Sequence, residues 1–188
     1  MTGTTDEDRK GAVASLEPGT QAVAMVSAMQ DPLRFLPDEA FDSLLVVCTR
    51  GDPRAVEERA RDAGADPSEV LVVPVSGASI RYKGDLRLAE RAAPSDMTKV
   101  GVNFTNGLTE LRERNDGSQC PWVVLDNFNI FLMYSNEKTV YRFMDSLTKE
   151  ARRADARGMY CTVRDAIGDT SYSKFRSLCD TEIDLRDS

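Results

Sequence analysis

Four short, uninterrupted apolar runs constrain the fold of this chain more than any other feature. They are SLLVVCT (43–49), VLVVPV (70–75), WVVL (122–125) and MYCTV (159–163). A strand with one face in water alternates apolar and polar residues, whereas a strand that is covered on both faces is apolar throughout. Helical patterns separate these runs. The sequence therefore predicts an α/β protein with a mostly parallel sheet and helices on both faces.

The helical segments carry recognisable boundary signals. One helix is expected to open at Asp52, which can act as its N-cap, and to end at Gly64. A second is expected over residues 97–114, where apolar residues recur at helical spacing although two glycines interrupt the pattern. The third follows a cap at Ser135 or Asn136, and its apolar stripe consists of Val140, Phe143, Met144, Leu147, Ala151 and Ala154.

The remaining elements complete one domain. Gly158 is expected to stop the third helix, and a short helix and the strand TEIDLR (181–186) follow. An apolar run at 22–27 predicts the first strand. Residues 1–20 are expected to be a frayed polar lead-in. We therefore predict a single α/β domain over residues 21–188, with no repeat and no linker.

Two connecting segments are predicted to be irregular. Residues 31–41 contain two prolines and are expected to form a loop with at most one helical turn. Residues 76–93 show no clear period. Within them RYKGDLRL (81–88) would suit a small hairpin with its turn at 83–85, and such an edge could pair with another chain.

Composition excludes several classes of function. A net charge of −7 argues against a general nucleic-acid-binding surface, which needs cations to displace counterions. The one basic run, RRADAR (152–157), is expected to complement a helix dipole. The absence of histidine removes histidine-based triads and the commonest metal ligand. No apolar run approaches the roughly 20 residues of a membrane span, and no signal peptide is visible, so a cytoplasmic location is expected.

The four cysteines show no metal-ligand spacing. Cys48, Cys120, Cys161 and Cys179 are scattered along the chain, and we expect them to be small thiols in a reducing compartment. A zinc site built from all four is the alternative. We expect neither a metal nor a cofactor.

An acid, Asp126, directly follows the apolar run WVVL. The stretch WVVLD (122–126) resembles the Walker B strand of RecA-superfamily domains of the KaiC type, in which such an acid holds magnesium. The segment 136–163 resembles the helix and next strand of that family, and CDTEIDL (179–185) is similar to its closing strand. The resemblance implies a RecA-like, three-layer fold over about residues 20–186. The chain resembles in particular the reduced RecA-like proteins of haloarchaea, and its acid-rich, lysine-poor composition also resembles halophilic archaeal proteins.

The phosphate-binding part of such a domain is missing. A P-loop needs glycines whose backbone N–H groups surround phosphate oxygens, followed by a lysine and a hydroxyl. The segment after the first strand is AMQDPLRFLP (28–37), which has no glycine, lysine, serine or threonine. Asp31 within it would repel phosphate. The sequence therefore predicts a degenerate P-loop.

A second catalytic part is also missing. The resemblance implies acidic residues after the second strand, one of which would activate the attacking water. This chain has CTRGDP (48–53) there, which puts Arg50 and Gly51 at those positions. An arginine does not lose its proton in proteins and cannot act as a base. We therefore expect a pseudo-ATPase with no catalytic residues.

Polar residues at the carboxyl ends of the strands are the candidates for any remaining site. The crevice there is the natural ligand position of an open parallel sheet. We interpret Asp126 as a vestigial acid that caps the Asn127–Phe128 backbone or pairs with an arginine, rather than as a magnesium ligand. Arg164 is expected to pair with Asp126 or Asp165, with anion binding as the alternative. The crevice candidates, besides Asp126, are Thr49, Arg50, Asn127, Asn129 and Arg164.

A dense apolar run between the predicted strand 122–125 and the third helix is either core or a partner surface. Its members are Phe128, Ile130, Phe131, Leu132, Met133 and Tyr134, and Tyr82 of the expected hairpin is a further interface candidate.

These features predict a non-catalytic RecA/KaiC-like domain that acts as a regulatory or scaffolding protein through protein–protein contacts. The partner would be a second copy or an intact RecA-like relative. The alternatives are a domain that binds a nucleotide or another ligand without a standard P-loop, and a transcriptional regulator, although no basic helix-turn-helix is visible.

Overall fold

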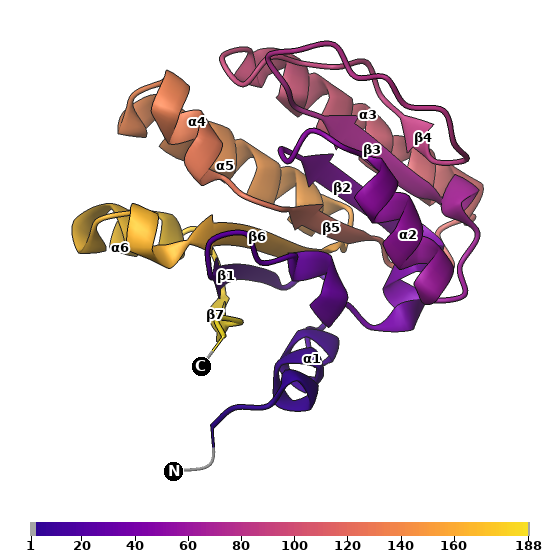
Figure 1. The fold of residues 1–188 in the computed structure, drawn as a ribbon, viewed down its shortest axis with the longest axis horizontal. Helices are drawn as coiled ribbons and strands as arrows, with labels where there is room; N and C mark the ends of the chain where they lie inside the picture. The colour runs from indigo at the N-terminus through magenta and orange to yellow at the C-terminus, as the bar shows by residue number, and fades with distance from the viewer. Residues whose placement is uncertain (1–2, 188) are drawn as a thin grey trace.

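The computed structural model describes residues 3–187, and its centre is a seven-stranded sheet (Figure 1). The strand order is β4-β3-β2-β5-β6-β1-β7, and every pairing is parallel. The strands are β1 (Gln21–Val26), β2 (Leu44–Cys48), β3 (Val70–Pro74), β4 (Arg87–Leu88), β5 (Trp122–Leu125), β6 (Arg157–Val163) and β7 (Thr181–Asp184). The predicted parallel α/β sheet is confirmed.

Helices cover both faces of the sheet and give three layers (Figure 1). One face carries α3 (Met97–Arg114), α4 (Asn129–Tyr134), α5 (Glu137–Arg153) and α6 (Asp169–Arg176). The other carries α1 (Asp6–Ala14), α2 (Arg54–Asp62) and the 3₁₀ turns Pro32–Phe35 and Asp38–Ser43. Within β2, Leu45 and Val47 join the first core while Leu44 and Val46 join the second. Burial on both faces is why this strand is apolar throughout.

The amino-terminal lead-in is not frayed over residues 6–14, which form α1. The Thr5 hydroxyl accepts a hydrogen bond from the Asp8 N–H at 3.1 Å, and the Asp8 carboxylate accepts one from the Thr5 N–H at 2.9 Å. This reciprocal pair satisfies two N–H groups that a helix start leaves without partners. Val13 is fully buried in the second core. The sequence analysis missed this helix because most of its residues are polar and only a narrow side of it is buried.

The prediction of a hairpin at 81–88 is wrong. Only Arg87 and Leu88 are strand, and they pair in parallel with β3. The Arg87 guanidinium donates to the Ser68 carbonyl at 2.7 Å, which ties this strand to the turn that precedes β3. Residues 31–41 form two short 3₁₀ turns rather than one helical turn at most.

Gly158 does not stop a helix. Helix α5 ends at Arg153, and Gly158 lies within β6. A Cβ atom at Gly158 would come 1.9 Å from Oε1 of the fully buried Gln21. That oxygen accepts from the Tyr160 hydroxyl at 2.8 Å, and Gln21 Nε2 donates to the Ala156 carbonyl at 2.9 Å. The glycine makes room for a satisfied polar group in the core.

Helix α3 is continuous, as the spacing of its apolar residues predicts, and one of its two glycines explains how it packs. The Asp96 side chain caps the helix by accepting from the Lys99 N–H at 3.0 Å. A Cβ at Gly107 would lie 2.6 Å from Cδ1 of Leu45, a buried residue of β2. A Cβ at Gly101 would meet its nearest atom, on Phe143, only at 4.0 Å. Gly107 therefore lets the helix lie close to the sheet.

These two glycines give a matched pair of substitutions. Gly107→Ala should lower the free energy of unfolding by about 1 kcal/mol or more, because overpacking costs roughly 1–3 kcal/mol and the gain in helix propensity is at most about 1 kcal/mol. Gly101→Ala should raise it by about 0.5–1 kcal/mol, since the methyl group fits. Urea unfolding of both variants measures the difference. Equal effects would show that Gly107 does not set the helix-to-sheet distance.

Candidate functional site

The carboxyl ends of β2 and β5 form the topological switch point of this sheet. The two strands are neighbours, and the chain leaves them toward opposite faces. After β2 it enters α2, whose Val56 packs in the second core, and after β5 it enters α4, whose Phe131 packs in the first. Ligands of open α/β sheets bind at such a point. Thr49 and Asp126 follow these two strands, so the fold brings two of the predicted candidates together.

Asp126 is held by Thr49, which the sequence analysis named as a crevice candidate but not as a partner of this acid. The Thr49 hydroxyl donates to Asp126 Oδ1 at 2.6 Å, and the Thr49 N–H donates to Oδ1 at 3.0 Å and to Oδ2 at 3.1 Å. The expected cap of the Asn127–Phe128 backbone and the expected arginine pair are both wrong. The side chain of Asp126 is 4% exposed. Burial raises the pKa of this carboxyl from 3.8 to about 6, and the bonds from Thr49 oppose that rise.

Arg50 ties the end of β2 to the loop that follows β1. Its guanidinium donates to the Met29 carbonyl at 3.4 Å and, in a shorter bond, to the Gln30 carbonyl. In the sheet β5 and β6 lie between β2 and β1, so this side chain reaches across the carboxyl edge. Arg50 also lowers the pKa of Asp126, although less than Thr49 does. The residue at the position expected for a catalytic acid thus fixes the loop at the position expected for a P-loop.

The loop after β1 satisfies its polar groups with its own side chains. The Ser27 N–H donates to Gln30 Oε1 at 2.8 Å, and the Leu33 N–H donates to the Asp31 carboxylate at 3.0 Å. Asp31 also accepts from the Arg59 guanidinium of α2 at 2.7 Å. In a P-loop, backbone N–H groups of this segment would point at phosphate oxygens. Here the side-chain amide of Gln30 and the carboxylate of Asp31 accept hydrogen bonds from two of these N–H groups.

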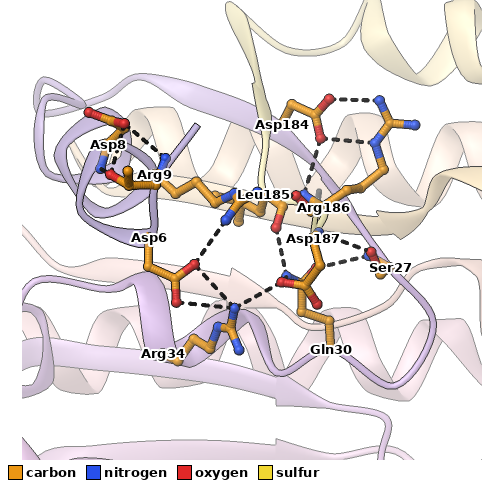
Figure 2. Close-up of polar contacts among 11 residues, drawn as sticks. Asp6, Asp8, Arg9, Ser27, Gln30, Arg34, Asp184, Leu185, Arg186 and Asp187 are labelled. Atoms are coloured by element: carbon orange, nitrogen blue, oxygen red, sulfur yellow. Dashed lines mark hydrogen bonds and ion pairs between the residues drawn. The ribbon is translucent and has the colours of Figure 1, made fainter. Parts of the chain in front are cut away.

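The two ends of the described chain close over the same loop (Figure 2). Gln30 is 6% exposed, and its Nε2 donates to the Leu185 carbonyl at 2.7 Å and to Asp187 Oδ1 at 3.1 Å. Figure 2 shows Arg34 between the carboxylates of Asp6 and Asp187, which it pairs with at 3.3 Å and 3.0 Å. The β1 loop, α1 and the segment after β7 therefore form one polar cluster.

Sequence reasoning did not single out Gln30, Arg34, Asp6 or Asp187 as members of one site. They come from three segments that lie far apart along the chain, and the adjacency of β1 and β7 at the edge of the sheet brings two of these segments, the β1 loop and the segment after β7, together. The position of Gln30 between two apolar segments could have indicated this cluster. A polar residue that is buried there needs hydrogen-bond partners within the protein.

The other crevice candidates serve separate local roles. Asn127 Oδ1 accepts from the Asn129 N–H at 3.0 Å. Asn129 Oδ1 accepts from the Thr162 hydroxyl and from the Val163 N–H, both at 2.9 Å, so it fastens α4 to β6. Neither amide reaches the Thr49–Asp126 pair through these bonds.

Arg164 does not pair with Asp126 or Asp165 as expected. Its guanidinium forms a short ion pair with Asp169 and donates to the Ile167 carbonyl at 3.0 Å. It also lies over the ring of Tyr172, 4.4 Å from the centroid. These contacts fix the turn between β6 and α6 and leave Arg164 out of the crevice.

The apolar run of interface candidates divides into two groups. Phe128 and Phe131 are fully buried, and Ile130 and Leu132 are partly buried against the first core. Met133 and Tyr134 at the end of α4 are 78% and 55% exposed. The run is a helix with a core side, and its carboxyl end remains a candidate surface.

Tyr82 is part of a local network. Its hydroxyl donates to Glu57 at 2.6 Å and accepts from the Leu86 N–H at 3.0 Å. Burial and the bond to Glu57 raise the pKa of this phenol to about 12. Its bonds attach the irregular segment to α2.

Residues 3–187 lack two features that would indicate a metal site or a membrane span. Within that range, no three acidic, cysteine or histidine side chains are grouped so that they could hold a metal ion. No helix of the same range combines the length and apolar character of a membrane span.

The comparisons with known proteins give a family and a fold. A family model described as a family of unknown function, DUF7504, matches residues 4–185. The chain belongs to that family. No curated protein matches it. A solved structure from Pyrococcus horikoshii OT3 is similar with a TM-score of 0.58, at 11% identity over 95% of this chain and 88% of that one. At this identity the similarity shows a common fold and nothing of function.

The buried carboxyl of this DUF7504 chain predicts a specific pH dependence. Its folded pKa of about 6 exceeds the unfolded value of about 3.9, so between these values the folded state binds more protons. The contribution of Asp126 to the free energy of unfolding is therefore greatest below about pH 4. It falls by on the order of 2–3 kcal/mol as the pH rises to about 6.

Asp126→Asn should remove most of that slope and change stability at pH 7 by less than about 1 kcal/mol, because the amide oxygen can still accept from Thr49 while its NH₂ lacks a partner. Asp52→Asn, at an exposed pair with Arg54, is the matched control and should keep the slope. Urea unfolding at pH 4–8 measures all three proteins. Parallel curves for wild type and Asp126→Asn would contradict the assignment.

Proposed function

We propose that this protein is a non-catalytic RecA/KaiC-like domain that acts as a regulatory or scaffolding protein through protein–protein contacts. The observation that carries the proposal is the internal satisfaction of the loop after β1. The Ser27 N–H and the carbonyls of Met29 and Gln30 all have partners within the chain. A phosphate would have to compete for the Ser27 N–H and the Arg50 guanidinium, and residues 28–37 offer no lysine, hydroxyl or glycine in addition.

The charges around this loop also oppose a nucleotide. Burial is the main reason that the pKa of Asp126 is raised, and repulsion by Asp31 adds a smaller rise. A triphosphate would add negative charge beside both, and magnesium prefers sites where substrate oxygens and waters complete its shell. The cations nearest this loop already have partners, because Arg50 donates to two carbonyls and Arg59 pairs with Asp31.

One observation favours the alternative of a ligand-binding domain. Thr49 and Asp126 occupy the switch point at which α/β sheets bind ligands. A neutral ligand that replaces the Thr49 hydroxyl bond would suit this position better than a nucleotide would.

The partner we propose is a second copy or an intact RecA-like relative, and we place the protein in the cytoplasm. The buried, unpaired thiols of Cys48 and Cys161 are consistent with a reducing compartment. The net charge of −7 disfavours nucleic acid as the partner.

Calorimetric titration with ATP at about 5 mM magnesium tests the proposed loss of ATP binding. We expect no binding with a dissociation constant below about 1 mM, because each displaced internal bond costs roughly 1 kcal/mol and no phosphate-binding group compensates. Arg50→Ala serves as the matched variant, since it frees the loop without adding a phosphate ligand, and it should also fail to bind. Micromolar affinity in the wild type that Asp126→Ala abolishes would show a working nucleotide site.

A further inference from the structure

The outer surface of the first helical layer contains an open groove between α3 and α5, which lie side by side on this face of the sheet (Figure 1). The groove has a volume of about 530 Å³, and it is lined by residues of α3 within 97–106 and residues of α5 within 139–147. Val102, Phe143 and Leu147 supply apolar surface, and Val102 is 53% exposed. The groove can therefore receive apolar side chains of another molecule.

The exposed charged residues of α5 all carry the same sign. They are Lys138, Arg142, Lys149 and Arg153, whereas the acids of this helix are only partly exposed. With Ser146 in the gap, these positions recur every three or four residues, which places them on one side of the helix. A protein with a net charge of −7 thus has a basic stripe along one wall of the groove.

Two cations of this basic stripe have no partner that explains their position. Lys149 pairs with Asp145 at 2.7 Å and Arg153 pairs with Glu150, near the end of the helix where the dipole favours cations. Lys138 and Arg142 form no ion pair or hydrogen bond with another residue of 3–187 through their side chains. Lys138 is the second residue of α5, where the helix dipole disfavours a cation. An anion from another molecule would stabilise both side chains.

The exposed charges of α3 lie beyond the groove. They are Glu110, Arg112, Glu113 and Arg114, and all of them follow Asn106, the last residue of α3 in the lining. Glu110 pairs with Arg87 and Arg114 with Glu69, so two of the four are bound to other elements. Within residues 3–187, Arg142 is the one charged residue that lines the groove. The hydroxyls of the lining, on Thr98, Thr105, Thr139 and Ser146, can also donate to an anion.

We infer that the α3–α5 groove binds an acidic amphipathic helix of a partner protein. The inference rests on the proposed function, which it makes specific by naming the surface and the chemistry of the partner. The apolar side of such a helix would cover Val102 and Phe143, and its carboxylates would pair with Lys138 and Arg142. Charge complementarity selects this partner, because the net charge of −7 repels an acidic segment elsewhere and the basic stripe attracts it here.

The dimensions of the groove suit a short helix. Residues 97–106 of α3 span about 15 Å at 1.5 Å per residue, which is the length of about ten residues of a partner helix. Lys138 and Arg142 lie one turn apart on α5, so two carboxylates four residues apart on the partner can reach both.

The basic stripe fits an acidic peptide better than a nucleic acid. Two of its four cations already pair with carboxylates of α5, which leaves Lys138 and Arg142 for an external anion. Binding of a nucleic acid depends on many cations that replace the counterions of the phosphate backbone. Two cations beside an apolar groove match a helix that carries a few acids and an apolar side.

Fluorescence anisotropy of a labelled peptide titrated with the full chain tests the inference. The probe is an amidated peptide of about 14 residues with Leu at positions i, i+4 and i+7 and Glu at the flanking positions. We expect a dissociation constant of about 10–300 µM at about 50 mM KCl and binding at least about tenfold weaker at about 500 mM, because salt screens the ion pairs. The same peptide with Gln in place of each Glu should bind at least about tenfold more weakly.

Three variants locate the binding surface. Arg142→Glu should weaken binding of the acidic peptide at least about tenfold, because it replaces an attraction by a repulsion. Val102→Ser should weaken it about threefold or more, because it removes apolar contact. Arg54→Glu makes the same change of charge at an exposed position of α2, on the opposite face of the sheet, and should change the affinity less than about twofold. Thermal melting establishes that all three variants fold.

Three outcomes would overturn the inference: no binding of the acidic peptide at about 1 mM protein, an affinity that Arg142→Glu leaves unchanged, or tighter binding of a single-stranded oligonucleotide of equal charge. None of these would restore nucleotide binding, so the proposed loss of ATP binding would stand on the calorimetry. Conversely, tight ATP binding would overturn the proposed function without changing the affinity of the groove for the peptide.

Discussion

The burial of both faces of the parallel sheet is the constraint on which the rest of this structure depends. Leu44, Leu45, Val46 and Val47 of β2 are all fully buried, and β3 and β5 are buried in the same way. Polar side chains are therefore excluded from the middle of these strands and lie where the strands end, at the edges of the sheet. The polar groups of the candidate site lie at the carboxyl edge, and each buried group there must find a partner.

In a nucleotide-binding relative part of that partnership would come from phosphate and magnesium. In this chain it comes from the protein. Thr49 satisfies Asp126, Arg50 satisfies two carbonyls of the β1 loop, and Gln30 joins the loop to the segment after β7. The residues that stand where the RecA-like resemblance implies a P-loop and a catalytic acid thus hold this edge together. An edge satisfied in this way can keep the fold stable without a ligand.

Sequence patterns predicted the elements whose burial follows a simple period. The apolar runs gave β2, β3, β5 and β6, and the stripe of α5 gave a helix that Asn136 caps by accepting from the Thr139 N–H at 2.9 Å. Patterns failed where tertiary contacts decide local structure. Gly158 had the spacing of a helix stop, but it makes room for Gln21. The 81–88 segment had turn residues, but β3 pairs with only its end.

The sequence predicted where the candidate site lies, but it did not predict which of its residues bond to one another. The end of an apolar strand places Asp126 and Thr49 at one edge, because neighbouring parallel strands end together. Their direct bond, and the reach of Arg50 to the β1 loop, depend on a strand order that no local pattern contains. The same is true of Arg34, whose two acids lie at opposite ends of the chain.

Amide hydrogen exchange at the carboxyl edge tests most directly whether the protein satisfies this edge by itself. The Ser27 N–H and the Thr49 N–H donate to Gln30 and Asp126 in the absence of any ligand. They should therefore exchange slowly, with protection that does not change when magnesium and ATP are added at about 5 mM. Fast exchange of both amides that becomes slow only with magnesium and ATP would show that a nucleotide, and not the chain, completes the site.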